Sequence, residues 1–155
     1  MSAAKFTPDG RQVVTAYLIV RNAAKAIEFY RKAFGAEEMF RLTEPQGKIG
    51  HAELRIRDSL LMLADEYPDF GALSPASIGG SPVSLHLYVE DVDRVVEGAA
   101  AAGATILRAV KDEFYGDRAG MILDPFGHKW HIATRKEDVS PQEMQRRWGA
   151  MFPAA

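Results

Sequence analysis

Apolar and polar residues alternate with a period of two in the first half of the chain, which is the pattern of β-strands with two different faces. One such strand is expected at residues 13–20, where Thr15 and Tyr17 share a face. A second is expected at residues 51–57, where Ala52, Leu54 and Ile56 point one way and His51, Glu53 and Arg55 the other. Shorter strands are expected at residues 37–42 and 60–63.

The spacing changes to that of a helix between the first two predicted strands. Asn22 is a residue type that caps helix starts, and Gly35 is one that follows helix ends. Between them an apolar stripe recurs at helical spacing, which predicts an amphipathic helix. Its members are Ala26, Phe29, Tyr30 and Ala33.

This order of elements recurs 69 residues further along the chain. Residues 17–20 match residues 86–89, and Asn22 matches Asp91 as a helix cap. The second helix carries Val92, Val95, Val96 and Ala99, and ends near Gly103. We infer an internal repeat of two βαβββ modules, at residues 12–63 and 83–134, joined by a connector at 64–82 that is rich in Pro and Gly.

The second module closes with two short strands around the turn Asp124-Pro125-Phe126-Gly127, within residues 116–134. This hairpin resembles the closing hairpin of the vicinal oxygen chelate superfamily, which includes glyoxalase I, bleomycin-binding proteins and extradiol dioxygenases. The chain looks most like the PhnB-like branch. The resemblance implies one domain at residues 12–134, an α+β fold in which the two modules form a cup-shaped mixed β-sheet.

The concave side of this cup is where a ligand or substrate is expected. Alternation along the predicted strands places residues of the first, third, fourth, fifth and last strands on this side. The aromatic ring of Tyr115, in the loop before the last hairpin, is expected there as well. The expected ligand-binding residues are Thr15, Tyr17, His51, Glu53, Met62, Ser84, His86, Tyr88, Tyr115 and His131.

A divalent metal ion is the cofactor that many members of this superfamily use. The resemblance puts their ligands at Thr15, Met62, Ser84 and His131, of which only His131 is a good ligand for Zn, Ni, Fe or Mn. We therefore expect no metal or other cofactor. A rearranged site of His131, His86 and Glu53 remains the alternative, and it would make the protein a lyase, isomerase or dioxygenase.

The metal-free interpretation is a cup that binds a small organic molecule, with aromatic walls and a few polar points. Whether the protein is an enzyme stays open. His51 and Glu53 lie two residues apart on one strand, so the carboxylate can orient the imidazole as a general base. A solvent-facing ion pair of little energy is the competing interpretation.

The composition of the chain excludes several kinds of chemistry and partner but adds no new candidate function. The 155 residues contain no cysteine, so disulfides, thiolate nucleophiles and Cys-bound metals are excluded. A net charge of −2 gives no reason to expect nucleic acid or an anionic membrane as partner. There is no apolar segment of membrane-spanning length and no signal sequence, so a cytoplasmic location is the default expectation.

The remaining residues, 135–155, predict a separate C-terminal amphipathic helix. Ser140, Pro141 and Glu143 form a capping box with Pro at the first helical position. The apolar stripe that follows must dock on its own domain or across a dimer, because so short a helix is marginal alone. Family analogy favours a homodimer. The stripe consists of Met144, Trp148, Met151 and Phe152.

Overall fold

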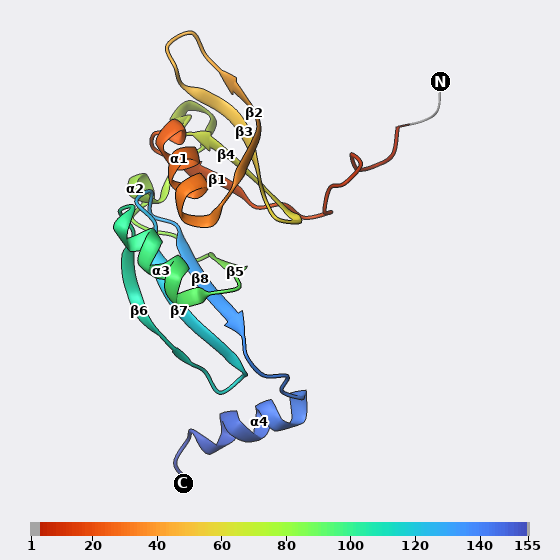
Figure 1. Ribbon diagram of the computed structural model, residues 1–155. Coiled ribbons are helices and arrows are strands. Elements are labelled where there is room, and N and C mark those ends of the chain that lie inside the picture. Colours follow the sequence, from red (N-terminus) through yellow and green to blue (C-terminus); the bar gives the residue numbers. More distant parts are fainter. Residues whose placement is uncertain (1–3, 155) are drawn as a thin grey trace. The chain divides into compact units, whose positions relative to one another are not determined.

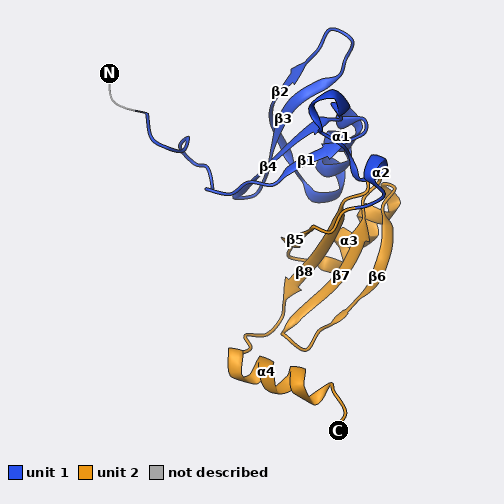
Figure 2. Cartoon of the chain, turned by 180° about the vertical axis from the view of Figure 1, so that it is seen from behind, with its two compact units in different colours: residues 1–80 blue, residues 81–155 orange. Residues whose placement is uncertain are grey.

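The computed structural model describes residues 4–154. The chain forms two compact units, unit 1 and unit 2, and the boundary between them in the sequence lies between Gly80 and Ser81 (Figure 2). Each unit contains one βαβββ module built on a four-stranded mixed sheet. The fold is therefore α+β with two such modules and a C-terminal helix, as the sequence predicts.

Unit 1 is built on a sheet with the strand order β1-β4-β3-β2, in which β1 runs parallel to β4 and the other pairs are antiparallel (Figure 1). Two short helical segments follow the last strand. The elements are β1 (Tyr17–Val20), α1 (Ala23–Phe34), β2 (Glu37–Thr43), β3 (Ile49–Ile56), β4 (Ser59–Asp65), the 3₁₀ helix η1 (Pro68–Phe70) and α2 (Pro75–Ile78).

The core of unit 1 lies between α1 and one face of this sheet. Ile27 and Tyr30 of α1 are fully buried, as are Leu54 and Leu63 on the strands. We call the opposite side of the sheet the open face of unit 1. Cross-strand pairing places four side chains on it side by side, because residues that pair directly share a face. They are Tyr17, Met62, Glu53 and Phe40.

One local prediction about unit 1, the start of its first strand, is wrong. Residues 13–16 are not part of a strand, since β1 begins at Tyr17 and its pairing with β4 begins at Met62. Val13 and Val14 are exposed, so no partner strand covers them. In the segment 64–82, β4 extends to Asp65, and η1 and α2 follow it. Pro at the first turn of each short helix is compatible with helical geometry.

Unit 2 repeats the same design with the strand order β5-β8-β7-β6. Helix α3 packs on β6, β7 and β8, and the other side of the sheet is the open face of unit 2. Pairing places His86, His131, Met121 and Arg108 side by side across it. The elements are β5 (Ser84–Tyr88), α3 (Val92–Ala101), β6 (Thr105–Asp112), β7 (Asp117–Leu123), β8 (Lys129–Arg135) and α4 (Pro141–Ala150).

The repeat extends to the way each helix is attached to its sheet. In unit 1 the Asp65 carboxylate accepts the Ala23 N–H at the start of α1, at 2.7 Å. In unit 2 the Thr134 hydroxyl accepts the Val92 N–H at the start of α3, at 2.9 Å, and donates to the Val89 carbonyl. Asp65 and Thr134 are 69 residues apart, as are Ala23 and Val92. An unpaired N–H in the first turn of the helix is thus satisfied from the same strand position in both units.

We predict that Thr134→Val destabilises the protein by about 1–2 kcal/mol, because it removes the partner of one N–H and one carbonyl while keeping the side-chain shape. Thr134→Ser, which keeps the hydroxyl, is the matched control and should lose less than half as much. Urea denaturation followed by circular dichroism measures both. Equal losses in the two variants would show that the hydroxyl does not contribute.

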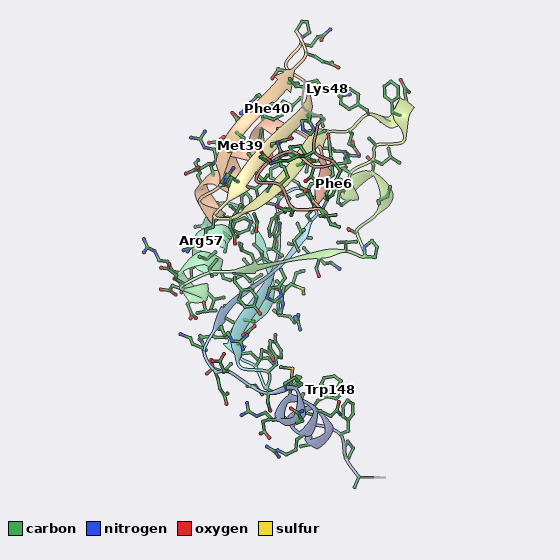
Figure 3. All side chains as sticks on the ribbon, turned by 90° about the vertical axis from the view of Figure 1, so that its right-hand side faces the viewer. Phe6, Met39, Phe40, Lys48, Arg57 and Trp148 are labelled. Atoms are coloured by element: carbon green, nitrogen blue, oxygen red, sulfur yellow. The ribbon has the colours of Figure 1, made fainter. Side chains whose placement is uncertain are left out.

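Helix α4 begins as predicted, with the Ser140 hydroxyl accepting the Glu143 N–H. Its Arg147 guanidinium donates to the Phe114 carbonyl and pairs with Glu137 and Glu143. The Trp148 ring lies 5.5 Å from that of Phe114, so the helix contacts its own unit, yet 47% of Trp148 stays exposed (Figure 3).

No helix within residues 4–154 combines the length and apolar character that crossing a membrane requires.

Candidate functional site

The open face of unit 1 carries a continuous chain of polar contacts. The Tyr17 hydroxyl lies 2.7 Å from His51 Nδ1, and His51 Nε2 lies 3.1 Å from Glu53 Oε1. The other carboxylate oxygen of Glu53 is paired with the Arg11 guanidinium. Tyr17 comes from β1, His51 and Glu53 from β3, and Arg11 from the segment before β1. The four side chains therefore form one network, which we call the Tyr17 network.

Burial and charge set the protonation of this network. Glu53 is only 5% exposed, but the hydrogen bond from Arg11 holds the pKa of its carboxyl below the usual value despite burial, and His51 adds to this. Burial and the negative charge of Glu53 raise the pKa of the Tyr17 phenol. Near neutral pH the network thus holds a carboxylate at one end and a neutral phenol at the other.

Aromatic rings surround the imidazole. The Phe40 ring lies 5.6 Å from that of His51, and the Tyr17 ring lies 5.4 Å from it. Phe40 comes from the neighbouring edge strand β2 (Figure 3). Tyr17 is 46% exposed and Phe40 is also exposed, so both rings present apolar surface next to hydrogen-bonding groups. This mixture is typical of small-molecule pockets.

The open face of unit 2 has a different set of contacts. His86 and His131 are direct partners on the parallel strands β5 and β8, and their Nδ1 atoms are 2.9 Å apart. One of the two must therefore donate and the other accept. The Tyr88 hydroxyl donates to buried Asp117 at 3.0 Å, which raises the pKa of Tyr88. The His86 ring also lies 4.7 Å from that of Tyr88, so the two pairs adjoin.

We predict that His131 binds a proton less tightly than an ordinary histidine. Burial lowers its pKa below 6.5, and the charges of His86 and Arg108 lower it further. Because the unfolded chain takes up this proton first, the contribution of His131 to stability is present above pH 6.5 and is lost as the pH falls toward the folded pKa. Proton NMR should give His131 a midpoint below that value, and His86→Asn should move the midpoint upward. A midpoint at or above the ordinary value would contradict this electrostatic picture.

The residues present do not fit the divalent metal site that the family resemblance implies. Thr15 precedes β1, Ser84 begins β5 and Met62 lies between Tyr17 and Glu53, so these positions offer hydroxyls and a thioether where Zn, Ni, Fe or Mn would need imidazole or carboxylate. Of the rearranged set, Glu53 lies in unit 1 and His86 and His131 lie in unit 2. Among residues 4–154, no three His, Asp or Glu side chains are grouped so as to hold one ion.

The structure thus joins several of the predicted site residues within each unit. In unit 1, Tyr17, His51 and Glu53 are linked by hydrogen bonds, and Met62 pairs with Tyr17. In unit 2 the corresponding group is His86, His131 and Tyr88. Thr15 precedes β1, and Ser84 pairs with Lys129 at the start of β5. Tyr115 packs on Phe114 in the loop between β6 and β7, where burial raises the pKa of Tyr115.

Sequence reasoning missed three residues of the open faces, namely Arg11, Phe40 and Asp117. Arg11 lies in a segment interpreted as a tail, and no local pattern marks it as a partner of Glu53. Asp117 is the first residue of β7 and lies on the open face two positions before Ala119 and four before Met121. Alternation along that strand was therefore a usable signal for Asp117. Phe40 pairs with Glu53 across a register shift in β2, which alternation does not predict.

Comparisons with known proteins agree with this fold. The family model described as Glyoxalase/Bleomycin resistance protein/Dioxygenase superfamily matches residues 11–132. The chain is 44% identical over 132 residues to the Mycobacterium tuberculosis (strain H37Rv) protein Rv0887c, which covers 83% of this chain and 78% of that protein. The chain therefore belongs to the glyoxalase/bleomycin resistance/dioxygenase superfamily.

Solved structures show the same architecture. The structure of the Arabidopsis thaliana gene product At5g48480 superimposes with a TM-score of 0.65 at 28% identity, covering 79% of this chain and 98% of that one. A Bacillus cereus protein described as a PhnB protein and a putative 3-demethylubiquinone-9 3-methyltransferase gives a TM-score of 0.63 at 21% identity, covering 79% and 99%. The second likeness is one of fold, and it places a PhnB-like protein among the structural neighbours.

Proposed function

We propose that this protein is a PhnB-like member of the superfamily that binds a small organic molecule on the open faces of its sheets, without the usual metal chelate. The observation that carries the proposal is the chemistry of these faces. Exposed aromatic rings lie beside imidazoles that are already hydrogen-bonded. The family resemblance assigns Thr15, Met62 and Ser84 to positions of the family's metal ligands, and none of these is an imidazole or a carboxylate.

Two physical features make such a face suitable for an organic ligand. Tyr17 and Tyr88 are 46% and 53% exposed, so their rings offer flat apolar surface on which a planar molecule can stack. Both hydroxyls are fixed by hydrogen bonds, to His51 and Asp117 respectively. A ligand that contacts them therefore does not have to order flexible side chains, which lowers the entropic cost of binding.

Binding of anilinonaphthalene sulfonate, a planar aromatic anion whose fluorescence rises in apolar surroundings, tests this proposal on protein treated with EDTA. We expect saturable binding that is unchanged by added Zn²⁺ and at least roughly tenfold weaker in Tyr17→Ala or Tyr88→Ala, consistent with the loss of one stacked ring. Phe70→Ala removes an exposed aromatic ring from η1 and should leave binding unchanged. Equal effects of all three substitutions would indicate non-specific adsorption and contradict the proposal.

The alternative function is that of a divalent-metal-dependent lyase, isomerase or dioxygenase with His131 as a ligand. The specific observation in its favour is the close pair of imidazoles at His86 and His131. Two imidazoles make an incomplete set for a structural or catalytic zinc ion, which takes three or four protein ligands. The metal-free function is therefore the one we favour.

Homodimer formation and a cytoplasmic location are also part of the proposal. Apolar side chains stay exposed on edge strand β2, at Met39 and Leu42, and on and just after α4, at Trp148 and Phe152. Exposed apolar groups of this kind support association of two copies. Light scattering coupled to size-exclusion chromatography should give twice the monomer mass of 17.1 kDa, and a value equal to the monomer mass would contradict this part.

A further inference from the structure

The four side chains of the Tyr17 network are connected end to end by polar contacts. Its contacts run in one line, from the Arg11 guanidinium through the Glu53 carboxylate and the His51 imidazole to the Tyr17 hydroxyl. Arg11 is the only member that is not on a strand, and its contact with Glu53 attaches the segment before β1 to the open face. Only the Tyr17 end of the line is substantially exposed.

The chemistry of each member fixes the direction of the hydrogen bonds. A carboxylate only accepts, so the Glu53 oxygen at 3.1 Å requires His51 to carry its proton on Nε2. In the tautomer that has no proton on Nδ1, the lone pair of this nitrogen accepts the Tyr17 O–H at 2.7 Å. A carboxylate that orients an imidazole, whose other nitrogen accepts a hydroxyl proton, is the general arrangement of an activated nucleophile.

Tyr17 is placed to use this arrangement toward a ligand. Its hydroxyl donates one hydrogen bond to His51, and the lone pairs of the oxygen can accept another. The Tyr17 ring is 46% exposed and adjoins the His51 ring, and the Phe40 ring contacts the same imidazole, so these rings provide surface for an aromatic compound. Glu53 is buried and paired with Arg11, so a positive charge that forms on His51 has a fixed negative partner.

We propose that Tyr17 and His51 form a proton-transfer site for an aromatic ligand that carries a weakly acidic hydroxyl. The ligand's O–H bond breaks and its proton goes to the Tyr17 oxygen, while the Tyr17 O–H bond breaks and that proton goes to His51 Nδ1. The products are the ligand anion, a restored Tyr17 hydroxyl and an imidazolium ion paired with Glu53. This inference rests on the proposed function, because it assigns a ligand class and a reaction to one of the proposed binding faces.

Unit 2 supplies an internal comparison. Tyr88 is exposed to a similar extent, at 53%, but its hydroxyl donates to the Asp117 carboxylate and not to an imidazole. The position that corresponds to Tyr17 in the repeat is His86, and the one that corresponds to Met62 is His131. The Tyr17 network is therefore a property of unit 1, and Tyr88 serves as a reference tyrosine in the same molecule.

Labelling with phenylmethanesulfonyl fluoride tests the proton-accepting role of His51 without any ligand. The Tyr17 oxygen forms a bond to sulfur, the S–F bond breaks, fluoride leaves and the phenol proton passes to His51 Nδ1. We expect Tyr17 to be sulfonylated on the order of 10²-fold faster than Tyr88, as a positioned general base allows. Mass spectrometry of peptides measures both rates in one sample of folded wild-type protein.

Variants then separate the roles in the network. His51→Gln should reduce labelling of Tyr17 to the rate of Tyr88, and Glu53→Gln should give an intermediate rate. His128→Gln, which changes a histidine in the turn before β8, should leave the rate unchanged. Similar rates for Tyr17 and Tyr88 in the wild-type protein would overturn the proposal, and this comparison does not depend on how well any variant folds.

The ligand class is tested with para-nitrophenol, whose anion absorbs visible light while the neutral phenol does not. Equilibrium dialysis measures how much is bound, and absorbance measures how much of the bound probe is ionised. We expect the bound probe to be ionised at a pH at which the free probe is neutral, and this ionisation to be lost in Tyr17→Phe. Binding of the neutral phenol alone would overturn proton transfer but leave the proposed function intact. No binding at all would overturn the ligand class.

Discussion

Replacing Asp124 by Ala is expected to destabilise the protein by about 3 kcal/mol or more, since one buried side chain serves three donors. Asp124 is 2% exposed, and its carboxylate accepts the backbone N–H groups of Phe126 and His128 and the indole N–H of Trp130, each at 2.9 Å. The substitution leaves these donors without their partner inside the turn that connects β7 to β8. Urea denaturation followed by circular dichroism measures the loss.

Two further variants show where this energy resides. Asp124→Asn keeps one oxygen as acceptor and should give an intermediate loss. Trp130→Phe removes the indole donor together with part of a buried ring. A double-mutant cycle with Asp124→Ala separates the hydrogen bond from this packing loss and should give a coupling of about 1.5–3 kcal/mol, as for a hydrogen bond to a charged group. A total loss below about 1 kcal/mol in Asp124→Ala would mean that the carboxylate does not hold the turn together.

Gly116→Ala is expected to be the most damaging glycine substitution, and Gly47→Ala is its matched control. The two residues have almost the same backbone conformation, with φ of +98° and +94°. A Cβ atom at Gly116 would lie 2.5 Å from the Glu137 carbonyl oxygen and 2.9 Å from Val139, whereas one at Gly47 would meet no atom within 4 Å. Both variants suffer backbone strain of about 1–2 kcal/mol, but only Gly116→Ala also has a clash.

The clash has a local consequence that can be observed. The Gly116 carbonyl accepts the N–H groups of Lys136 and Glu137, so the clash displaces the segment that leads from β8 into α4. We expect Gly116→Ala to lose at least about 2 kcal/mol more than Gly47→Ala and to change the fluorescence of Trp148, which contacts Phe114. Equal losses of unfolding free energy in the two variants would show that residues 136–139 can move away from the added Cβ atom without an energetic penalty.

The sequence predicts the order of elements well because the relevant signals are local and occur twice. Asn22, Asp91 and Ser140 cap their helices as expected, and each accepts the N–H three residues later. Alternation also places His51 and Glu53 on one face, where they are hydrogen-bonded. Alternation fails at residues 13–16 because a strand also needs a partner strand, and the sequence of one strand does not show where its partner ends.

The contacts that define the candidate site are less predictable, because they join segments far apart in the sequence. The bond between Tyr17 and His51 depends on the register of β1 on β4 and of β4 on β3. The contact between Arg11 and Glu53 depends on the path of a segment without regular structure. A pattern of residue types identifies which side chains share a face, but it does not identify which of them touch.

We propose above that the open faces bind an organic ligand without a metal chelate. Calorimetric titration of untagged, EDTA-treated protein with Zn²⁺, Ni²⁺ and Mn²⁺ tests it most directly, with His131→Ala as the matched variant. We predict no saturable binding at micromolar or tighter affinity, and the same weak heats for both proteins. Stoichiometric binding of one of these ions to the wild-type protein, lost in His131→Ala, would contradict metal-free ligand binding and favour a metal-dependent enzyme.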